Sequence, residues 1–131
     1  MLTDLKIEHV AVSSKSVEDS DIFFIELLNL KKERDFIVSE GLMEQFFGVR
    51  KTQRVIRYGN ENINVEAFIM DDDSYALDKF THTCLQIEDR EKLIDRAKKL
   101  KFNVIKIPRK NNEGFYLFLK DSFGNLFEIK E

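Results

Sequence analysis

The chain contains one pattern of expected strands and helices twice, and this repeat limits the fold more than any other feature of the sequence. Residues 7–13 and 81–87 alternate between the two faces of an extended chain and hold β-branched residues, which is typical of strands. Each segment is followed by a helical apolar stripe and then by three further expected strands. A repeat of this length predicts two copies of one βαβββ module.

The first copy is the longer one. Ser16 and Asp19 resemble a capping box, and we expect a helix from there to about Leu28. The last two strands are joined by a turn at residues 59–62, which has the composition of a hairpin loop. Residues 39–52 have the weakest pattern of the chain, and we expect no regular element there. The expected strands of this copy are residues 7–13, 31–38, 53–58 and 63–70.

The second copy repeats the order with shorter connections. Its helix is expected over residues 90–100. Pro108 ends the strand that follows this helix, because proline has no N–H to donate to a strand ladder. Its expected strands are residues 81–87, 104–107, 115–120 and 126–130. The predicted fold is α+β: one domain of residues 1–131 with modules at about 5–70 and 80–131, in which a curved mixed sheet forms a cup with helices outside.

Four side chains with metal-binding chemistry stand at matching places of the two copies. His9 and His82 lie near the start of the first strand of each copy, and Glu66 and Glu128 lie in the last. Side chains alternate across a strand, so all four point away from the apolar faces that the helices cover. Any half-exposed strand shows polar residues there. The matching positions therefore carry the prediction of a site for Ni²⁺, Co²⁺, Zn²⁺, Mn²⁺ or Fe²⁺.

Further candidates for the site are single residues with weaker signals. Arg109 could bind an anionic substrate near the cup rim, or be a surface arginine. Tyr116 could donate a hydrogen bond to a substrate, or pack or face solvent. Phe46 and Phe47 could line the mouth of the cup, or anchor the long connection between strands. Cys84 is expected to be a small buried residue.

Composition limits the partners and the compartment. The formal net charge is −3, so the chain has no basic excess for a phosphate backbone, and nucleic-acid binding is not expected. A lone cysteine cannot form an intrachain disulfide, which favours a reducing compartment. The sequence shows neither a secretory signal nor an apolar run of the roughly 20 residues that a membrane span needs. We expect a cytoplasmic protein with a small-molecule partner.

Nearly the whole chain resembles the vicinal oxygen chelate family, which includes glyoxalase I, bleomycin-binding proteins, fosfomycin-resistance enzymes and extradiol dioxygenases. The first half carries the resemblance in "FFIELLNL" and "VEAF". The most specific segment is "DSFGNLFE" at residues 121–128, which matches the family's aspartate–glycine–asparagine turn before a metal-binding glutamate. The resemblance implies that His9, Glu66, His82 and Glu128 occupy the four ligand positions of glyoxalase I.

The resemblance also implies a reaction class. A glyoxalase-like lyase or isomerase would remove a proton next to a carbonyl whose oxygens chelate the metal, with Glu128 or Glu66 as the catalytic base. A homodimer is expected, and the cup closes either within one chain or across two. Two other readings stay open. One is a metal-free protein that sequesters an antibiotic, and the other is a fosfomycin-resistance-type transferase or an extradiol dioxygenase-like enzyme.

Overall fold

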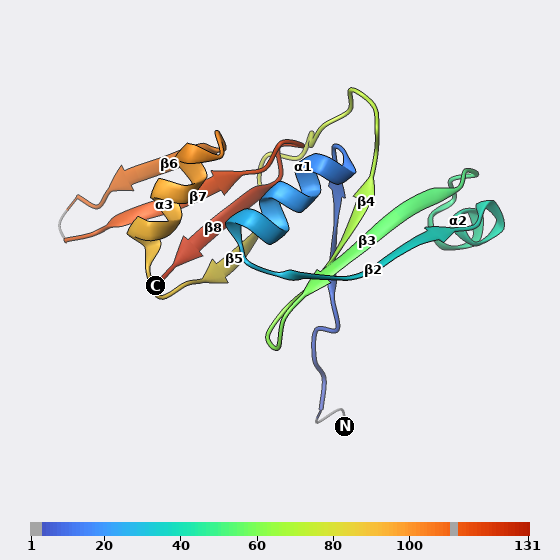
Figure 1. Ribbon diagram of the computed structural model, residues 1–131, viewed down its shortest axis with the longest axis horizontal. Helices are drawn as coiled ribbons and strands as arrows, with labels where there is room; N and C mark the ends of the chain where they lie inside the picture. Colours follow the sequence, from blue (N-terminus) through green and yellow to red (C-terminus); the bar gives the residue numbers. More distant parts are fainter. Residues whose placement is uncertain (1–3, 111–112) are drawn as a thin grey trace. The chain divides into compact units, whose positions relative to one another are not determined.

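The computed structural model describes residues 4–110 and 113–131, which form two compact units. The first unit ends at Asp72 and the second begins at Asp73. Each unit contains one four-stranded sheet and follows the order strand, helix, strand, strand, strand (Figure 1). The predicted α+β class and the predicted tandem βαβββ modules are therefore confirmed, with one additional helix in the first unit.

The sheet of the first unit has the strand order β1-β4-β3-β2. Strand β1 runs parallel to β4, and the other neighbours are antiparallel. The predicted second strand agrees with the observed one at both ends, whereas the first begins three residues later than expected. The strands are β1 (Val10–Ser14), β2 (Lys31–Val38), β3 (Gln53–Gly59) and β4 (Asn64–Ile69).

The sheet of the second unit repeats this topology as β5-β8-β7-β6, again with its first strand parallel to its last. Helix α3 (Arg90–Lys99) begins after Asp89, whose carboxylate accepts a hydrogen bond from the Lys92 N–H. Leu93, Ile94 and Ala97 of this helix are buried, as its apolar stripe predicted. The strands are β5 (His82–Gln86), β6 (Asn103–Pro108), β7 (Phe115–Lys120) and β8 (Leu126–Lys130).

The predicted first helix has two parts. Helix α1 (Val17–Asp21) is capped by Ser16, whose hydroxyl accepts from the Asp19 N–H at 3.1 Å, as the capping-box signal indicated. It continues into a π-helix, η1 (Ile22–Leu27), where the Leu28 N–H donates to the Phe23 carbonyl five residues earlier. None of the described helices is long and apolar enough to cross a membrane.

The π-helix supplies the largest side chains of the first core. Phe23, Phe24 and Leu27 are each at most 2% exposed. The Phe24 ring stacks on Tyr58 of β3 with a centroid separation of 4.9 Å. The buried Tyr58 hydroxyl donates to Asp21 at 2.7 Å, and burial raises its pKa, so it remains a protonated donor. Helix and sheet therefore share one aromatic core, which leaves the other face of the sheet open.

Residues 39–52 contain a helix that the sequence pattern did not predict. Helix α2 (Glu40–Phe47) belongs to the connection that leads from the end of β2 to the start of β3 (Figure 1). The Ser39 hydroxyl caps its start by accepting from the Leu42 N–H, and Gly48 ends it with a φ of +71°. Met43 is its one buried residue, although Leu42, Met43, Phe46 and Phe47 stand at helical spacing and form a short apolar stripe that the prediction missed.

The turn before β8 has the structure that its sequence predicted. The Asp121 carboxylate accepts from the backbone N–H groups of Phe123 and Asn125 at 3.0 and 2.8 Å, and from the Asn125 amide at 2.8 Å. Gly124 has a φ of +96°, which favours glycine. Burial raises the pKa of Asp121, against the effect of these hydrogen bonds. The turn fixes where β8 begins and therefore sets the position of Glu128 in the sheet.

Candidate metal centre

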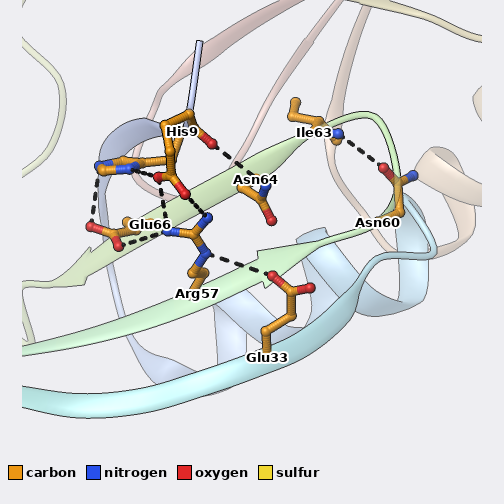
Figure 2. A network of polar contacts seen from close by, with 8 residues as sticks. His9, Glu33, Arg57, Asn60, Ile63, Asn64 and Glu66 are labelled. Atoms are coloured by element: carbon orange, nitrogen blue, oxygen red, sulfur yellow. Dashed lines mark hydrogen bonds and ion pairs between the residues drawn. The ribbon is translucent and has the colours of Figure 1, made fainter. Parts of the chain in front are cut away.

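The first unit brings two of the predicted ligands together. Glu66 lies in β4 between the buried residues Val65 and Ala67, so its side chain lies on the opposite, open face of the sheet. The Nε2 atom of His9 is 3.4 Å from the Oε1 atom of Glu66 (Figure 2). His9 does not belong to a strand, however, because β1 begins only at Val10. The prediction that it lies within the first strand was therefore wrong by one residue.

The second unit brings the other two predicted ligands together in the same way. His82 is the first residue of β5, and its Nε2 atom is 3.4 Å from the Oε1 atom of Glu128. The registers also agree. Glu66 pairs with Ala11, two residues after His9, and Glu128 pairs with Cys84, two residues after His82. The two histidine–glutamate pairs thus occupy equivalent places.

Both histidines use the Nδ1 atom for a hydrogen bond and leave Nε2 facing the glutamate. The Nδ1 atom of His82 is 2.8 Å from the Phe80 carbonyl oxygen, and that of His9 is 2.6 Å from the Glu8 carboxylate. Hydrogen bonds from Arg57, and then from His9, lower the pKa of Glu8 to about 2, so this carboxylate is ionised. Both partners can only accept, so Nδ1 donates and Nε2 of the neutral ring holds a lone pair.

This donor set fits a divalent ion. In each pair the Nε2 lone pair faces a carboxylate oxygen, and two acceptors need a proton or a cation between them. Ligand atoms about 2.1 Å from one ion lie roughly 3.0–3.4 Å apart, which matches the observed separations. In neither unit do the described residues gather three or more His, Cys, Asp or Glu side chains as a metal site would require. Each unit by itself supplies two of the four candidate ligands.

The two pairs differ in their neighbours. Arg57 pairs with Glu66 across β3 and β4, and its Nη1 atom lies 3.3 Å from the Oε2 atom of Glu66. Phe118 holds the equivalent position beside Glu128, and its ring centroid is 6.0 Å from that of His82. Among the described residues, no lysine or arginine pairs with Glu128. One glutamate therefore shares its charge with a guanidinium and the other does not.

The two predicted substrate-binding residues contact each other. The guanidinium carbon of Arg109 lies 4.7 Å from the centroid of the Tyr116 ring, a cation–π distance, and both residues are exposed. Tyr116 alternates along β7 with the buried Leu117 and so shares the open face with Phe118, which pairs with Glu128. Contact with a substrate stays a prediction for both residues.

The remaining candidates lie on or near the open faces. The Phe47 ring of α2 meets the Phe68 ring edge to face at a centroid separation of 5.6 Å, and Phe68 shares its face of β4 with Glu66. Phe46 and Phe47 are both exposed. The prediction that Cys84 is buried was wrong, because its side chain lies on the open face of β5 and is exposed.

Solved structures with the same fold come from bacterial relatives of low sequence identity. A glyoxalase family protein from Enterococcus faecalis is 18% identical, with a TM-score of 0.70, over 96% of this chain and 97% of its own. One from Bacillus cereus is 15% identical, with a TM-score of 0.72, over 98% and 94%. A mutant of the fosfomycin resistance protein FosX from Listeria monocytogenes, complexed with Mn(II) and 1S,2S-dihydroxypropylphosphonic acid, is 18% identical, with a TM-score of 0.70, over 99% and 90%.

A family model agrees with the fold. No curated protein sequence matches the chain closely enough to add a relative. The model of the Glyoxalase/Bleomycin resistance protein/Dioxygenase superfamily matches residues 6–129, which include both histidine–glutamate pairs and all of the two sheets except Lys130. The chain therefore belongs to the glyoxalase/bleomycin resistance protein/dioxygenase superfamily.

Proposed function

We propose that the protein is a metal-dependent, glyoxalase-like lyase or isomerase in which one divalent ion is held by His9, Glu66, His82 and Glu128. The observation that carries this proposal is that each unit holds a histidine–glutamate pair of the same geometry. In each pair the histidine Nε2 atom is 3.4 Å from a glutamate oxygen, and the Nδ1 atom forms a hydrogen bond. A structural accident would not place two histidines so similarly. The Mn(II) bound to FosX supports a divalent ion, and Ni, Co, Zn, Mn and Fe all suit these ligands.

Glu128 is the better candidate for the catalytic base. When bound, the ion would supply positive charge that polarises a substrate carbonyl and makes the adjacent C–H more acidic. The base must then accept that proton at short range. The Arg57 guanidinium engages the Glu66 carboxylate at 3.3 Å and leaves it less free to approach a substrate, whereas Glu128 pairs with no lysine or arginine among the described residues. Arg109 and Tyr116 would bind an anionic part of the substrate.

The first prediction concerns the metal itself. Protein purified without a metal-affinity tag should contain close to one transition-metal ion per chain. Removal of the ion should lower the melting temperature, because an ion at 100 times its Kd stabilises the folded state by about 2.7 kcal/mol. Elemental analysis and thermal unfolding, before and after dialysis against a chelator and after addition of Ni²⁺, would measure both. Protein with no stoichiometric metal and no response to Ni²⁺ would favour the metal-free, antibiotic-sequestering alternative.

The similarity to FosX favours a second candidate, a fosfomycin-resistance-type enzyme. The family resemblance implies two histidines and one glutamate as ligands for that class, and Arg57 already engages Glu66. Glu66→Gln separates the two functions. Our proposal expects Ni²⁺ affinity, measured by calorimetry, to fall at least about tenfold. A three-ligand site of His9, His82 and Glu128 would bind Ni²⁺ with nearly unchanged affinity and should act on an epoxide.

We further propose that the protein is a homodimer. Four large apolar side chains outside the two sheets are 84–88% exposed, and their burial against a second copy of the chain would remove apolar surface from water. They are Leu5, Ile7, Leu77 and Phe80. Sedimentation velocity should give a mass twice that of the 15.5 kDa chain. Phe80→Asp should shift the protein toward monomer, and a wild-type protein that stays monomeric at 100 µM would contradict the proposal.

A further inference from the structure

His9 lacks the backbone support that its counterpart has. His82 is part of β5 and pairs with Leu126, so the ladder holds it in place. His9 precedes β1, and the described residues before it, beginning at Asp4, are exposed and outside any strand. A metal ligand must be held within about 0.5 Å of its working position. Side-chain contacts must therefore hold His9.

The Glu8 carboxylate supplies one such contact. Its Oε1 atom lies 2.6 Å from His9 Nδ1, so the residue next to the candidate ligand orients the imidazole. Arg57 in turn holds Glu8 through two hydrogen bonds, from Nη2 to Oε2 at 2.7 Å and from Nη1 to Oε1 at 3.2 Å. Two parallel bonds from a planar guanidinium fix the carboxylate more firmly than a single bond would.

Arg57 connects this segment to the second ligand of the first unit. It belongs to β3, and its side chain is only 16% exposed. The guanidinium also contacts Glu66, at 3.3 Å, and approaches Glu33 at 3.6 Å, so it lies among the carboxylates of Figure 2. The Arg57 guanidinium thus contacts both Glu8, which orients His9, and Glu66, which His9 faces.

We propose that Glu8 and Arg57 are positioning residues that fix the orientation and the tautomer of His9. This inference deepens the proposed metal function and rests on it. A carboxylate that accepts from Nδ1 keeps the proton on that atom and leaves Nε2 free to bind a metal. In the second unit the Phe80 carbonyl does the same for His82 from the backbone. The two half-sites therefore reach one geometry by different means.

The tautomer provides a test that needs no metal. The chain has two histidines, so a long-range ¹⁵N–¹H spectrum of the imidazoles contains two spin systems, with His82 as internal reference. At a pH that keeps the rings neutral, both should be protonated on Nδ1. Glu8→Ala should move the His9 proton to Nε2, leave His82 unchanged and leave the backbone spectrum folded. An unchanged His9 tautomer in this variant would overturn the inference.

Metal affinity tests the consequence for the site. Arg57→Met and Glu8→Ala should each weaken Ni²⁺ binding, measured by calorimetry, by about 10- to 100-fold, the range for removal of a residue that orients a ligand. Arg54→Met is the matched control. Arg54 lies on the same strand and holds Asp35 by two bonds, at 2.7 and 3.0 Å, without contacting His9. Glu33→Gln removes a carboxylate near Arg57 that does not contact His9.

The outcomes separate this inference from the proposed function. Weaker binding in Arg57→Met and Glu8→Ala, with both controls near wild type, supports the positioning role. Equal losses in Arg57→Met and Arg54→Met would overturn it, because they would reflect only the removal of an arginine from β3. A wild-type protein that does not bind Ni²⁺ would overturn the proposed metal function, and the His9 tautomer would then still show whether Glu8 orients the ring.

Discussion

Glu128→Gln is expected to lower turnover by about 10²- to 10⁴-fold, the usual contribution of a general base. Glutamine has the shape of glutamate but cannot take up a proton at neutral pH. The fold should persist, because Glu128 lies on the open face of β8 while the neighbouring Phe127 and Ile129 are buried. The measurement is the rate at which α-hydroxycarbonyl compounds, including thiol adducts of 2-oxoaldehydes, exchange or transfer the proton next to the carbonyl at saturating Ni²⁺.

The matched control is Glu66→Gln under the same conditions. Since Glu66 is proposed as a metal ligand that Arg57 engages and not as the base, this variant should lose metal affinity but recover much of the turnover once the metal is in excess. The reverse result, an inactive Glu66→Gln and an active Glu128→Gln, would show that Glu66 is the base. Near-wild-type turnover in both variants would contradict proton abstraction by either glutamate.

Phe24→Ala should destabilise the protein by about 3–5 kcal/mol, the usual cost of removing a large aromatic side chain from a core. Phe24 is 1% exposed, stacks on Tyr58 and meets Phe23 edge to face at 5.1 Å. Urea unfolding followed by circular dichroism would measure the loss of stability.

Phe46→Ala is the control for this substitution, because it removes the same atoms from a side chain that is 63% exposed. A surface change of this kind should alter the free energy of unfolding by no more than about 0.5 kcal/mol. If the two variants unfolded at similar urea concentrations, the aromatic core between the π-helix and β3 would not be the main support of the first unit.

The sequence predicted those parts of the fold whose side chains alternate between buried and exposed positions. Strands β7, Phe115–Lys120, and β8, Leu126–Lys130, alternate in this way and were predicted at both ends. The second strand, Lys31–Val38, was also predicted at both ends, although none of its residues is buried. The first strand was predicted too early, because the β-branched Ile7 was included in it although Ile7 is 84% exposed and does not share a strand face with Val10 and Val12. Helix α2 was not predicted, although Ser39 and Gly48 mark its ends and Leu42, Met43, Phe46 and Phe47 repeat at helical spacing, because eight residues give the pattern barely two turns.

The candidate ligands could be predicted because the repeat allows each position to be compared with the equivalent position in the other copy. Glu66 and Glu128 stand opposite buried strand faces, and each has a histidine two residues before the residue with which it pairs. Glu8 and Arg57 could not be found in this way. They are 49 residues apart and have no counterparts in the second unit, where Phe118 stands in place of the arginine. A charged residue on an open face looks like any solvated side chain until its contacts are known.

The central claim is that one metal ion joins the two histidine–glutamate pairs, and anomalous diffraction from crystals soaked in Ni²⁺ tests it most directly. We predict one strong anomalous peak per chain, about 2.1 Å from Nε2 of a His9 and a His82 and from carboxylate oxygens of a Glu66 and a Glu128. The same map would show whether the two pairs come from one chain or from two. A peak bound to only one pair, or no peak at these four residues, would contradict the claim.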